Sequence, residues 1–178
     1  MPMETKIGKT TLRLVTGDIA DQDTDAVVTA AHWRLNKGTG TDGTIHTKGG
    51  PRIYEECWRI GGCPMGDAVI TTGGDLKARH VIHAVGPVWR GGDHGEPVQL
   101  AGAYRSALSI AAELGARTLT LPAISAGAYG YPLDDAARIA IATVADSLRA
   151  GAPLEQVTFV LYSTRTLAAF ERALAAFR

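Results

Sequence analysis

The segment Thr29–His46 carries side chains whose types could carry out acid–base chemistry. Its single carboxylate, Asp42, lies among three glycines and four threonines. A carboxylate in such a loop can orient or deprotonate a water molecule and stabilise the positive charge that develops in a transition state. The simpler alternative is that Asp42 is the N-cap of a helix that starts near Gly43.

Two further side chains of this segment, His32 and Lys37, have chemistry of their own. An imidazole can donate a proton to a leaving group or hold a water molecule, and a lysine can contact a phosphate or a hydroxyl group. Each of the two can equally be a solvated loop residue. We interpret His46, in the expected helix, and His83, in an apolar strand, as structural histidines.

A second candidate site is the loop PAISAGAYGYP, residues 122–132, which connects an apolar strand to a long helical pattern. A glycine-containing loop at the carboxyl end of a strand can direct several backbone N–H groups at an anion such as phosphate. Ser125, Gly127 and Gly130 would provide the curvature, and Tyr129 a wall. The loop matches neither the P-loop nor the dinucleotide-binding pattern, and an ordinary strand–helix connection is the alternative.

A third candidate is Asp18, which follows the first expected strand and a glycine. Its carboxylate could accept a hydrogen bond from an exocyclic amine, such as that of adenine. The alternative is an aspartate that caps a turn.

Strand and helix patterns alternate along the chain, and the expected elements position the candidate site residues. Short β-branched runs predict strands, and apolar residues at helical spacing between glycines or prolines predict helices. Strands are expected over 11–16, 26–30, 68–72, 80–85, 118–124 and 157–162, and helices over 43–48, 51–60, 97–114, 133–149 and 167–177, the last capped by Thr164. The alternation predicts a single α/β structure with helices on both faces of a central sheet.

The composition suits one globular domain over residues 1–178, with residues 1–9 as a flexible N-terminal extension. Lys plus Arg and Asp plus Glu number 18 each, so the chain has no net positive charge that would attract nucleic acid. A local basic patch remains compatible with this balance. Cys57 and Cys63 are expected to be reduced thiols. No apolar run reaches the roughly 20 residues of a membrane span, and no signal peptide is visible. We therefore expect a cytoplasmic monomer without a metal or cofactor.

Several motifs, taken in chain order, resemble the macro domain family, the fold that binds ADP-ribose. They are GDI (17–19), GTGTDGTIH (38–46), GGP (49–51), EEC (55–57), GDAVIT (66–71), HVIHAVGP (80–87) and SAGAYGYP (125–132). The match covers nearly the whole chain. Within the family the sequence is similar to the hydrolases that remove single ADP-ribose units, which include O-acetyl-ADP-ribose deacetylases. The resemblance implies a three-layer α/β/α sandwich with a central mixed sheet.

The resemblance also implies a role for each matching residue. Asp18 would accept a hydrogen bond from the adenine amino group with Ile19 beside it, and Tyr162 would pack on the adenine. Asp42 takes the position of the family's catalytic aspartate, near the anomeric carbon of the distal ribose. The other substrate-binding residues are Thr29, Gly38, Thr39, Gly40 and Gly43 towards the distal ribose, and Ser125, Ala126, Gly127, Ala128, Tyr129 and Gly130 around the diphosphate.

The segment around Asp42 departs from the family's usual pattern. This chain reads TAAH at 29–32 where the branch usually has Asn-Ala-Ala-Asn, and KGTG at 37–40 where it usually has four glycines. The adenine and phosphate elements are kept. The kept elements predict binding of ADP-ribose. Hydrolysis, with Asp42, His32 and Lys37 as catalytic residues, is a second expectation, which depends on the segment that departs from the pattern.

The expected partners are ADP-ribose and ADP-ribosylated macromolecules. The acceptor of the cleaved bond would be a protein carboxylate, the acetate of O-acetyl-ADP-ribose, or a base of single-stranded DNA. A non-catalytic ADP-ribose reader and an RNA- or poly(ADP-ribose)-binding module are the competing functions. The residues that could seat a nucleic acid are Trp33 and the local bases Arg34, Lys37, Lys48 and Arg52, although a solvated face with Trp33 packed inward is the plainer interpretation.

Overall fold

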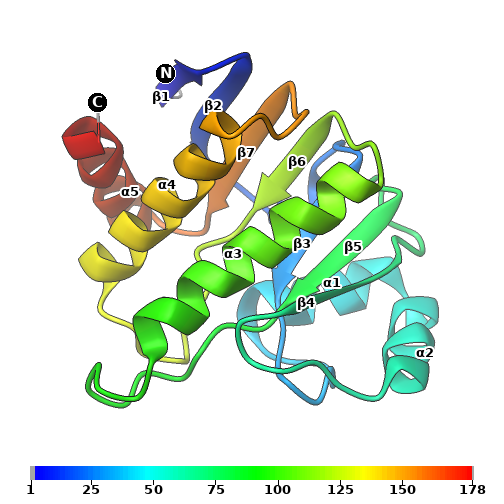
Figure 1. Cartoon of the computed structure of the whole chain (residues 1–178). Coiled ribbons are helices and arrows are strands. Elements are labelled where there is room, and N and C mark those ends of the chain that lie inside the picture. The colour runs from blue at the N-terminus through cyan, green and yellow to red at the C-terminus, as the bar shows by residue number, and fades with distance from the viewer. Residues whose placement is uncertain (1–2, 178) are drawn as a thin grey trace.

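Five parallel strands form the centre of a seven-stranded sheet, and one antiparallel strand closes each edge (Figure 1). The computed structural model describes residues 3–177 and gives the strand order β1-β2-β7-β6-β3-β5-β4. The strands are β1 (Met3–Ile7), β2 (Thr10–Thr16), β3 (Ala26–Ala30), β4 (Ala68–Thr72), β5 (His80–Ala84), β6 (Thr118–Leu121) and β7 (Gln156–Leu161). The sheet is mixed, as predicted.

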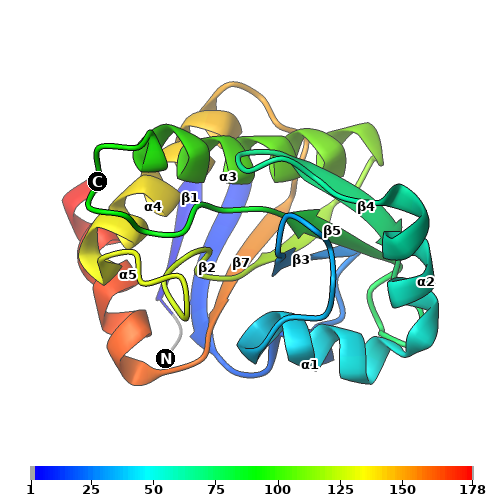
Figure 2. The same ribbon diagram turned by 90° about the horizontal axis from the view of Figure 1, so that it is seen from below.

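Helices cover both faces of this sheet, with α3 and α4 on one side and α1 on the other (Figure 2). They are the short 3-10 helix η1 (Ile19–Asp21) and the helices α1 (Gly40–Gly49), α2 (Pro51–Ile60), α3 (Glu96–Glu113), α4 (Leu133–Arg149) and α5 (Thr164–Phe177). The expected three-layer α/β/α sandwich is thereby confirmed. None of the helices within residues 3–177 combines the length and apolarity that crossing a bilayer demands.

Alternate side chains of the strands enter two separate apolar clusters, one on each face of the sheet. On β3, Val28 belongs to the larger cluster, which lies under α3, α4 and α5, whereas Val27 belongs to the smaller cluster under α1 and α2. Burying such a side chain stabilises the fold by roughly 1.5–3 kcal/mol. The sheet therefore holds both helical layers in place.

The larger cluster also fixes the start of the loop that follows β6. Tyr104 of α3 is fully buried against Phe159 of β7. Its hydroxyl donates to the carbonyl of Pro122 at 2.8 Å and accepts from the backbone N–H of Ile124 at 2.9 Å. The backbone on either side of residue 123 is thus tied to the core.

Most of the predicted elements are confirmed with small shifts at their ends, but two helix starts are wrong. Helix α1 begins at Gly40 rather than Gly43, and α5 begins at Thr164, the residue that the sequence predicts as its cap. The cap of α5 is Ser163, whose hydroxyl oxygen accepts from the backbone N–H of Thr166 at 3.1 Å. A serine before the first turn is a favoured N-cap, so this signal was present in the sequence.

The expectation of a flexible extension at residues 1–9 is wrong for the part of it that the structure describes. Met3–Ile7 form the edge strand β1, which pairs antiparallel with β2. Ile7 is buried, and Arg13 of β2 makes an ion pair of 2.9 Å with Glu4. Five residues of mixed polarity carry a weak strand signal, and pairing with β2 decides their structure. Residues 1 and 2 lie outside the described residues.

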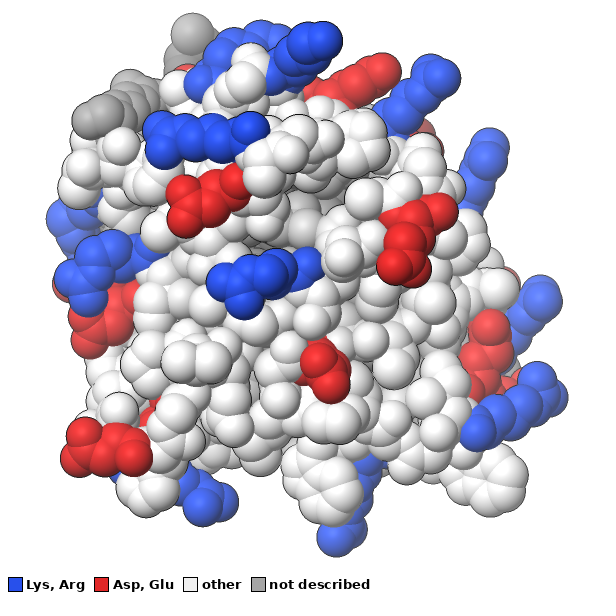
Figure 3. All heavy atoms as spheres, in the orientation of Figure 1, with Lys and Arg blue, Asp and Glu red and all other residues white. Residues whose placement is uncertain are grey.

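Acidic and basic side chains are interspersed over the face of the molecule drawn in Figure 3. Lys plus Arg and Asp plus Glu are equal in number. This face therefore presents no broad field of a single sign.

Candidate active site

A cavity of about 830 Å³ opens at the carboxyl ends of the central parallel strands. This is the edge at which open α/β sheets bind their ligands. The walls come from the segments after β2, β3, β6 and β7 and from the start of α1. The lining residues are Gly17, Asp18, Ile19, Ala30, His32, Asn36, Lys37, Gly38, Thr39, Gly40, Thr41, Asp42, Thr44, Ala123, Ser125, Gly127, Ala128, Tyr129, Val160 and Tyr162.

Most of the site residues predicted from the sequence line this one cavity, although they come from four distant parts of the chain. Thr29, Gly43, Ala126 and Gly130 do not line it. Thr29 is fully buried next to Asp42. The other three are sequence neighbours of residues that do line it.

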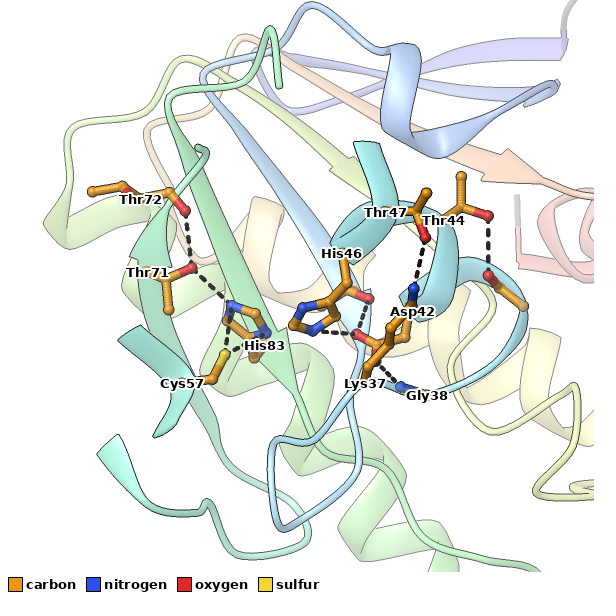
Figure 4. Close-up of polar contacts among 12 residues, drawn as sticks. Lys37, Gly38, Asp42, Thr44, His46, Thr47, Cys57, Thr71, Thr72 and His83 are labelled. Carbon is orange, nitrogen blue, oxygen red and sulfur yellow. Dashed lines mark hydrogen bonds and ion pairs between the residues drawn. The ribbon is translucent and has the colours of Figure 1, made fainter. Parts of the chain in front are cut away.

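Asp42 lies in the first turn of α1 with its carboxylate held by two donors (Figure 4). Oδ1 accepts a 2.8 Å hydrogen bond from the hydroxyl of Thr29, and Oδ2 accepts a 2.7 Å bond from the backbone N–H of Gly38. The residue is 2 % exposed, so these bonds set the orientation of the carboxylate. The N-cap interpretation of Asp42 is wrong, because the N-cap of α1 is Thr39, which makes no side-chain cap bond.

The glycines around Asp42 are required by close packing of the loop against α1. A Cβ on Gly38 would lie 3.0 Å from Oδ2 of Asp42, and a Cβ on Gly43 would lie 2.8 Å from the carbonyl oxygen of Gly38. Upstream, Leu35 has a φ of 59° and is buried in the smaller cluster. Its side chain anchors the loop, while the residues that follow it face the cavity.

His46 contacts Asp42 from one helical turn further along α1. Its Nε2 lies 3.6 Å from Oδ1 of Asp42, both side chains are buried, and the His46 ring lies between Asp42 and His83 in Figure 4. The sequence interpretation of His46 as structural overlooked this contact. The signal was the spacing of four residues, which places two side chains on one face of a helix.

His46, Cys57 and His83 form a buried cluster behind Asp42 whose possible metal-ligand atoms lie within 4.8 Å of one another. Burial lowers the pKa of His83 to about 3, and its Nε2 is 2.8 Å from the hydroxyl of Thr71. Burial, reinforced by the charge of Asp42, raises the pKa of Cys57 to about 12. The thiol is therefore protonated at neutral pH, whereas metals bind the thiolate. This matches the expectation of a reduced cysteine and a core histidine.

His32 and Lys37 both reach the cavity, and each has a partner of its own. The Nδ1 atom of His32 accepts from the backbone N–H of Arg34 at 3.1 Å, which in a neutral imidazole leaves the proton on Nε2. Lys37 donates from Nζ to the hydroxyl of Thr47 at 2.8 Å (Figure 4). Lys37 is exposed on the rim, so its ammonium group can exchange this partner for a ligand.

The loop after β6 turns sharply at Ser125, which has a φ of 65° and is buried. The Ser125 hydroxyl donates to the carbonyl of Pro87 at 2.7 Å. A Cβ on Gly86 would lie 2.3 Å from that hydroxyl oxygen, so only glycine fits there. A non-glycine residue in the left-handed backbone region, as Ser125 is, costs roughly 1–3 kcal/mol and persists where its surroundings hold it. By contrast, a Cβ on Gly127 would meet nothing within 4 Å.

A second loop, residues 88–95, supports the loop after β6 from outside. The backbone N–H of Trp89 donates to the carbonyl of Tyr129 at 2.9 Å, and the Trp89 ring lies 4.7 Å from that of Tyr131. Glu96, which is 1 % exposed, accepts from the backbone N–H groups of Arg90, Gly92 and His94. Burial of this carboxyl raises its pKa, but the backbone donors outweigh burial and lower the pKa to about 2.

Asp18 serves as a cap and also lines the cavity, so the two interpretations from the sequence do not exclude each other. Its Oδ1 accepts from the backbone N–H of Ala20 at 2.9 Å, which caps η1. Its Oδ2 accepts from Nζ of Lys48 at 2.6 Å, and Lys48 also contacts Asp21 at 3.0 Å. The bonds from Lys48 and Ala20 hold the pKa of Asp18 below its usual value. Tyr162, directly after β7, is 62 % exposed across the cavity mouth.

Sequence reasoning missed several residues of the cavity wall. Asn36, Thr41 and Thr44 line it beside the glycine loop, and Val160 lines it from β7. Asn36, Thr41 and Thr44 all belong to the segment Thr29–His46, which was already a candidate site. Val160 belongs to an apolar strand pattern, which carries no signal for ligand binding.

Comparison with known proteins agrees with this geometry. The family model described as "Macro domain" matches residues 28–140. A macro domain-containing protein of Caldanaerobacter subterraneus is 48 % identical over 93 % of this chain and 96 % of its own length. An O-acetyl-ADP-ribose deacetylase of Citrobacter koseri is 47 % identical over 93 % of this chain and 96 % of its own length.

Solved structures show the same fold. A macrodomain of Oceanobacillus iheyensis with ADP has a TM-score of 0.95 and 33 % identity, and the match covers 99 % of this chain and 96 % of that one. A Trypanosoma brucei macrodomain in complex with ADP-ribose has a TM-score of 0.85 and 36 % identity, with 92 % and 68 % covered. The family match, these relatives and the cavity at the strand ends lead to one conclusion: the chain belongs to the macro domain family.

Proposed function

We propose that the cavity binds ADP-ribose and that the protein hydrolyses the bond between the distal ribose and an acceptor group. The similar Trypanosoma brucei macrodomain was solved with ADP-ribose, and the Citrobacter koseri relative is an O-acetyl-ADP-ribose deacetylase by name. The cavity volume of about 830 Å³ suits a nucleotide-sized ligand, since sites for small molecules and cofactors measure roughly 300–1,000 Å³.

The two ends and the middle of the cavity offer different chemistry to such a ligand. Asp18 and Tyr162 offer a carboxylate and an exposed aromatic ring, which suit the amino group and the face of an adenine. Ser125, Gly127 and Tyr129 lie on a loop whose backbone N–H groups suit a diphosphate. A carboxylate has about four acceptor positions, so Asp18 can keep its bond from Lys48 and accept from an amine.

The observation that carries the proposed hydrolysis is the buried carboxylate of Asp42 on the cavity wall. Two donors, Thr29 and Gly38, fix its orientation and leave it lone pairs for a water molecule. In the proposed step the oxygen of that water bonds to the anomeric carbon as the bond from this carbon to the acceptor breaks. The acceptor leaves with the bonding electrons, and Asp42 takes the proton of the water.

Other groups near Asp42 complete this step. A carboxylate next to the reacting carbon stabilises the positive charge that the ribose acquires in the transition state. His32 lines the cavity and, with its proton on Nε2, can donate a hydrogen bond to the leaving group. Lys37 can contact a phosphate or a ribose hydroxyl from the rim.

The test is release of ADP-ribose by the wild type and by the variant Asp42→Ala. The substrates are a protein mono-ADP-ribosylated on a carboxylate, O-acetyl-ADP-ribose, and ADP-ribosylated single-stranded DNA. We expect release by the wild type from at least one substrate and loss of release in the variant. A wild type that binds free ADP-ribose but releases it from none of the three would be a reader, and the enzyme proposal would be wrong.

A further inference from the structure

An apolar hollow of about 400 Å³ lies beside the cavity and is lined by Trp33, Gly62, Cys63, Pro64 and Met65. Its two sides are tied together, because the backbone N–H of Cys63 donates to the carbonyl of Trp33 at 2.8 Å. Trp33 and Met65 are 44 % and 36 % exposed. The interpretation in which Trp33 packs inward is therefore wrong, and the hollow is a preformed apolar surface.

The surroundings of the Trp33 ring decide what kind of group fits the hollow. The Arg34 guanidinium lies 4.7 Å from the centroid of the indole ring, and the His32 ring lies 5.5 Å away at 31°. Both groups already pack against the indole ring. The remaining walls are the sulfur and carbon atoms of Cys63, Pro64 and Met65. Because these walls are apolar and the polar edges of a base would lose their hydrogen bonds there, an aliphatic side chain fits this hollow better than a base does.

The hollow continues from the reacting end of the cavity. His32 lines the cavity and its ring contacts that of Trp33, which lines the hollow. A substituent that leaves the cavity past His32 therefore reaches the hollow next. The group attached to the distal ribose is the acceptor, so the acceptor's own surroundings would lie here.

Charge at the rim adds a second preference. Within residues 3–177, no carboxylate makes an ion pair with Arg34. By contrast, Lys48 is engaged by Asp18 and Asp21. Arg34, next to Trp33 in the sequence, is thus a cation beside the hollow that can pair with an acidic partner.

We propose that this hollow seats an apolar side chain of the acceptor polypeptide, close in sequence to the ADP-ribosylated residue, while Arg34 pairs with a neighbouring carboxylate of the same polypeptide. The inference rests on the proposed function and names its substrate class. The hollow would make the protein selective among ADP-ribosylated proteins. Hydrolysis of a substrate whose acceptor is as small as acetate would not depend on the hollow.

The test compares two mono-ADP-ribosylated peptides that differ at one position, leucine or serine, next to the modified glutamate. The variants are Met65→Ser and Arg34→Gln, and the matched control is Val98→Ser, because Val98 is 76 % exposed on α3 and lines neither cavity. Both peptides also carry one unmodified glutamate nearby. We expect Met65→Ser to lower kcat/KM for the leucine peptide roughly tenfold, which corresponds to about 1.4 kcal/mol, and to change kcat/KM for the serine peptide less than twofold. Arg34→Gln should lower kcat/KM for both peptides, because both carry the carboxylate that pairs with Arg34. Neither variant should change kcat/KM for O-acetyl-ADP-ribose more than twofold, and the control variant should not do so on any substrate.

Two results would overturn the inference and leave the proposed function standing. One is equal activity of the wild type and both hollow variants on the leucine peptide. The other is a loss confined to ADP-ribosylated single-stranded DNA, which would make the occupant a nucleic acid. If the wild type releases ADP-ribose from no substrate, the proposed hydrolysis is wrong. In that case calorimetry with the same variants tests the inference separately. Tighter binding of the leucine peptide than of the serine peptide, lost in Met65→Ser, would support it, and equal affinities would contradict it.

Discussion

The hydroxyl of Thr29 on β3 donates a 2.8 Å hydrogen bond to Oδ1 of Asp42 on α1, and both residues are almost completely buried. This bond joins the central sheet to the helix that carries the proposed catalytic carboxylate. The family's usual residue at this position is asparagine, so the threonine preserves a donor to the site in a smaller side chain. The change Thr29→Val removes that donor while keeping the shape of the side chain.

For Thr29→Val we expect kcat to fall roughly tenfold while KM for the substrate stays within twofold. A hydrogen bond to a charged group is worth about 1.5–3 kcal/mol. Part of this free energy holds the Asp42 carboxylate in its active orientation, and that part is lost in the variant. Thr29→Ser, which keeps the hydroxyl, is the control and should restore most of kcat. Steady-state kinetics on one substrate measures both values. Equal kcat in Thr29→Val and wild type would show that the bond does not orient Asp42.

For Asp42→Asn we expect a loss of at least a hundredfold in kcat, because an amide cannot take the proton of the water. The side chain keeps its size and one acceptor oxygen, so the fold and the affinity for ADP-ribose should be retained. Single-turnover release and calorimetric titration give the two quantities. Unchanged release would remove Asp42 from the mechanism.

For Asp18→Ala we expect the affinity for ADP-ribose to fall roughly tenfold, through loss of a charged acceptor in the cavity. Turnover at saturating substrate should change little, because Asp18 is proposed to bind the adenine end. Asp21→Ala is the matched control, since Asp21 also contacts Lys48 but does not line the cavity. Equal effects of the two changes on affinity would assign the loss to Lys48 rather than to an adenine contact.

For Gly127→Glu we expect the fold to be retained and ADP-ribose binding to fall more than tenfold. A Cβ at this position meets nothing within 4 Å, so the backbone accommodates the change, and the side chain enters the cavity. Its negative charge would repel a diphosphate. Gly127→Gln separates bulk from charge and should bind more tightly than Gly127→Glu at low salt. Circular dichroism verifies folding, and calorimetry measures affinity.

For Glu96 we expect a stability contribution that depends on pH. The folded-state pKa of about 2 lies below the ordinary glutamate value, so the carboxylate stabilises the fold above pH about 4.5, and this contribution is lost as pH falls towards 2. Glu96→Gln should therefore lower Tm at pH 7 by several degrees, on the order of 5 °C. The difference from wild type should shrink as the pH approaches 2. A difference that persists undiminished at low pH would contradict the assignment.

The sequence by itself determined the elements and most of the candidate site. The β-branched runs and the glycine and proline boundaries identify the strands β2 to β7 and the helices α1 to α5, and the motifs around Asp18, Asp42 and Ser125 identify the family. These signals are local, because they depend on side-chain period, helix capping and loop glycines. The resemblance also implied the roles that are now proposed for these residues.

Only the tertiary structure decided the contacts between segments. It turned residues 3–7 into a strand through pairing with β2, brought His46 to Asp42, and left Trp33 exposed beside an apolar hollow. It also gave Thr29, which replaces an asparagine of the family, a hydrogen bond to Asp42. No local pattern encodes these distances, because the packing of α1, α2 and the loops against the sheet sets them, and packing depends on the whole chain.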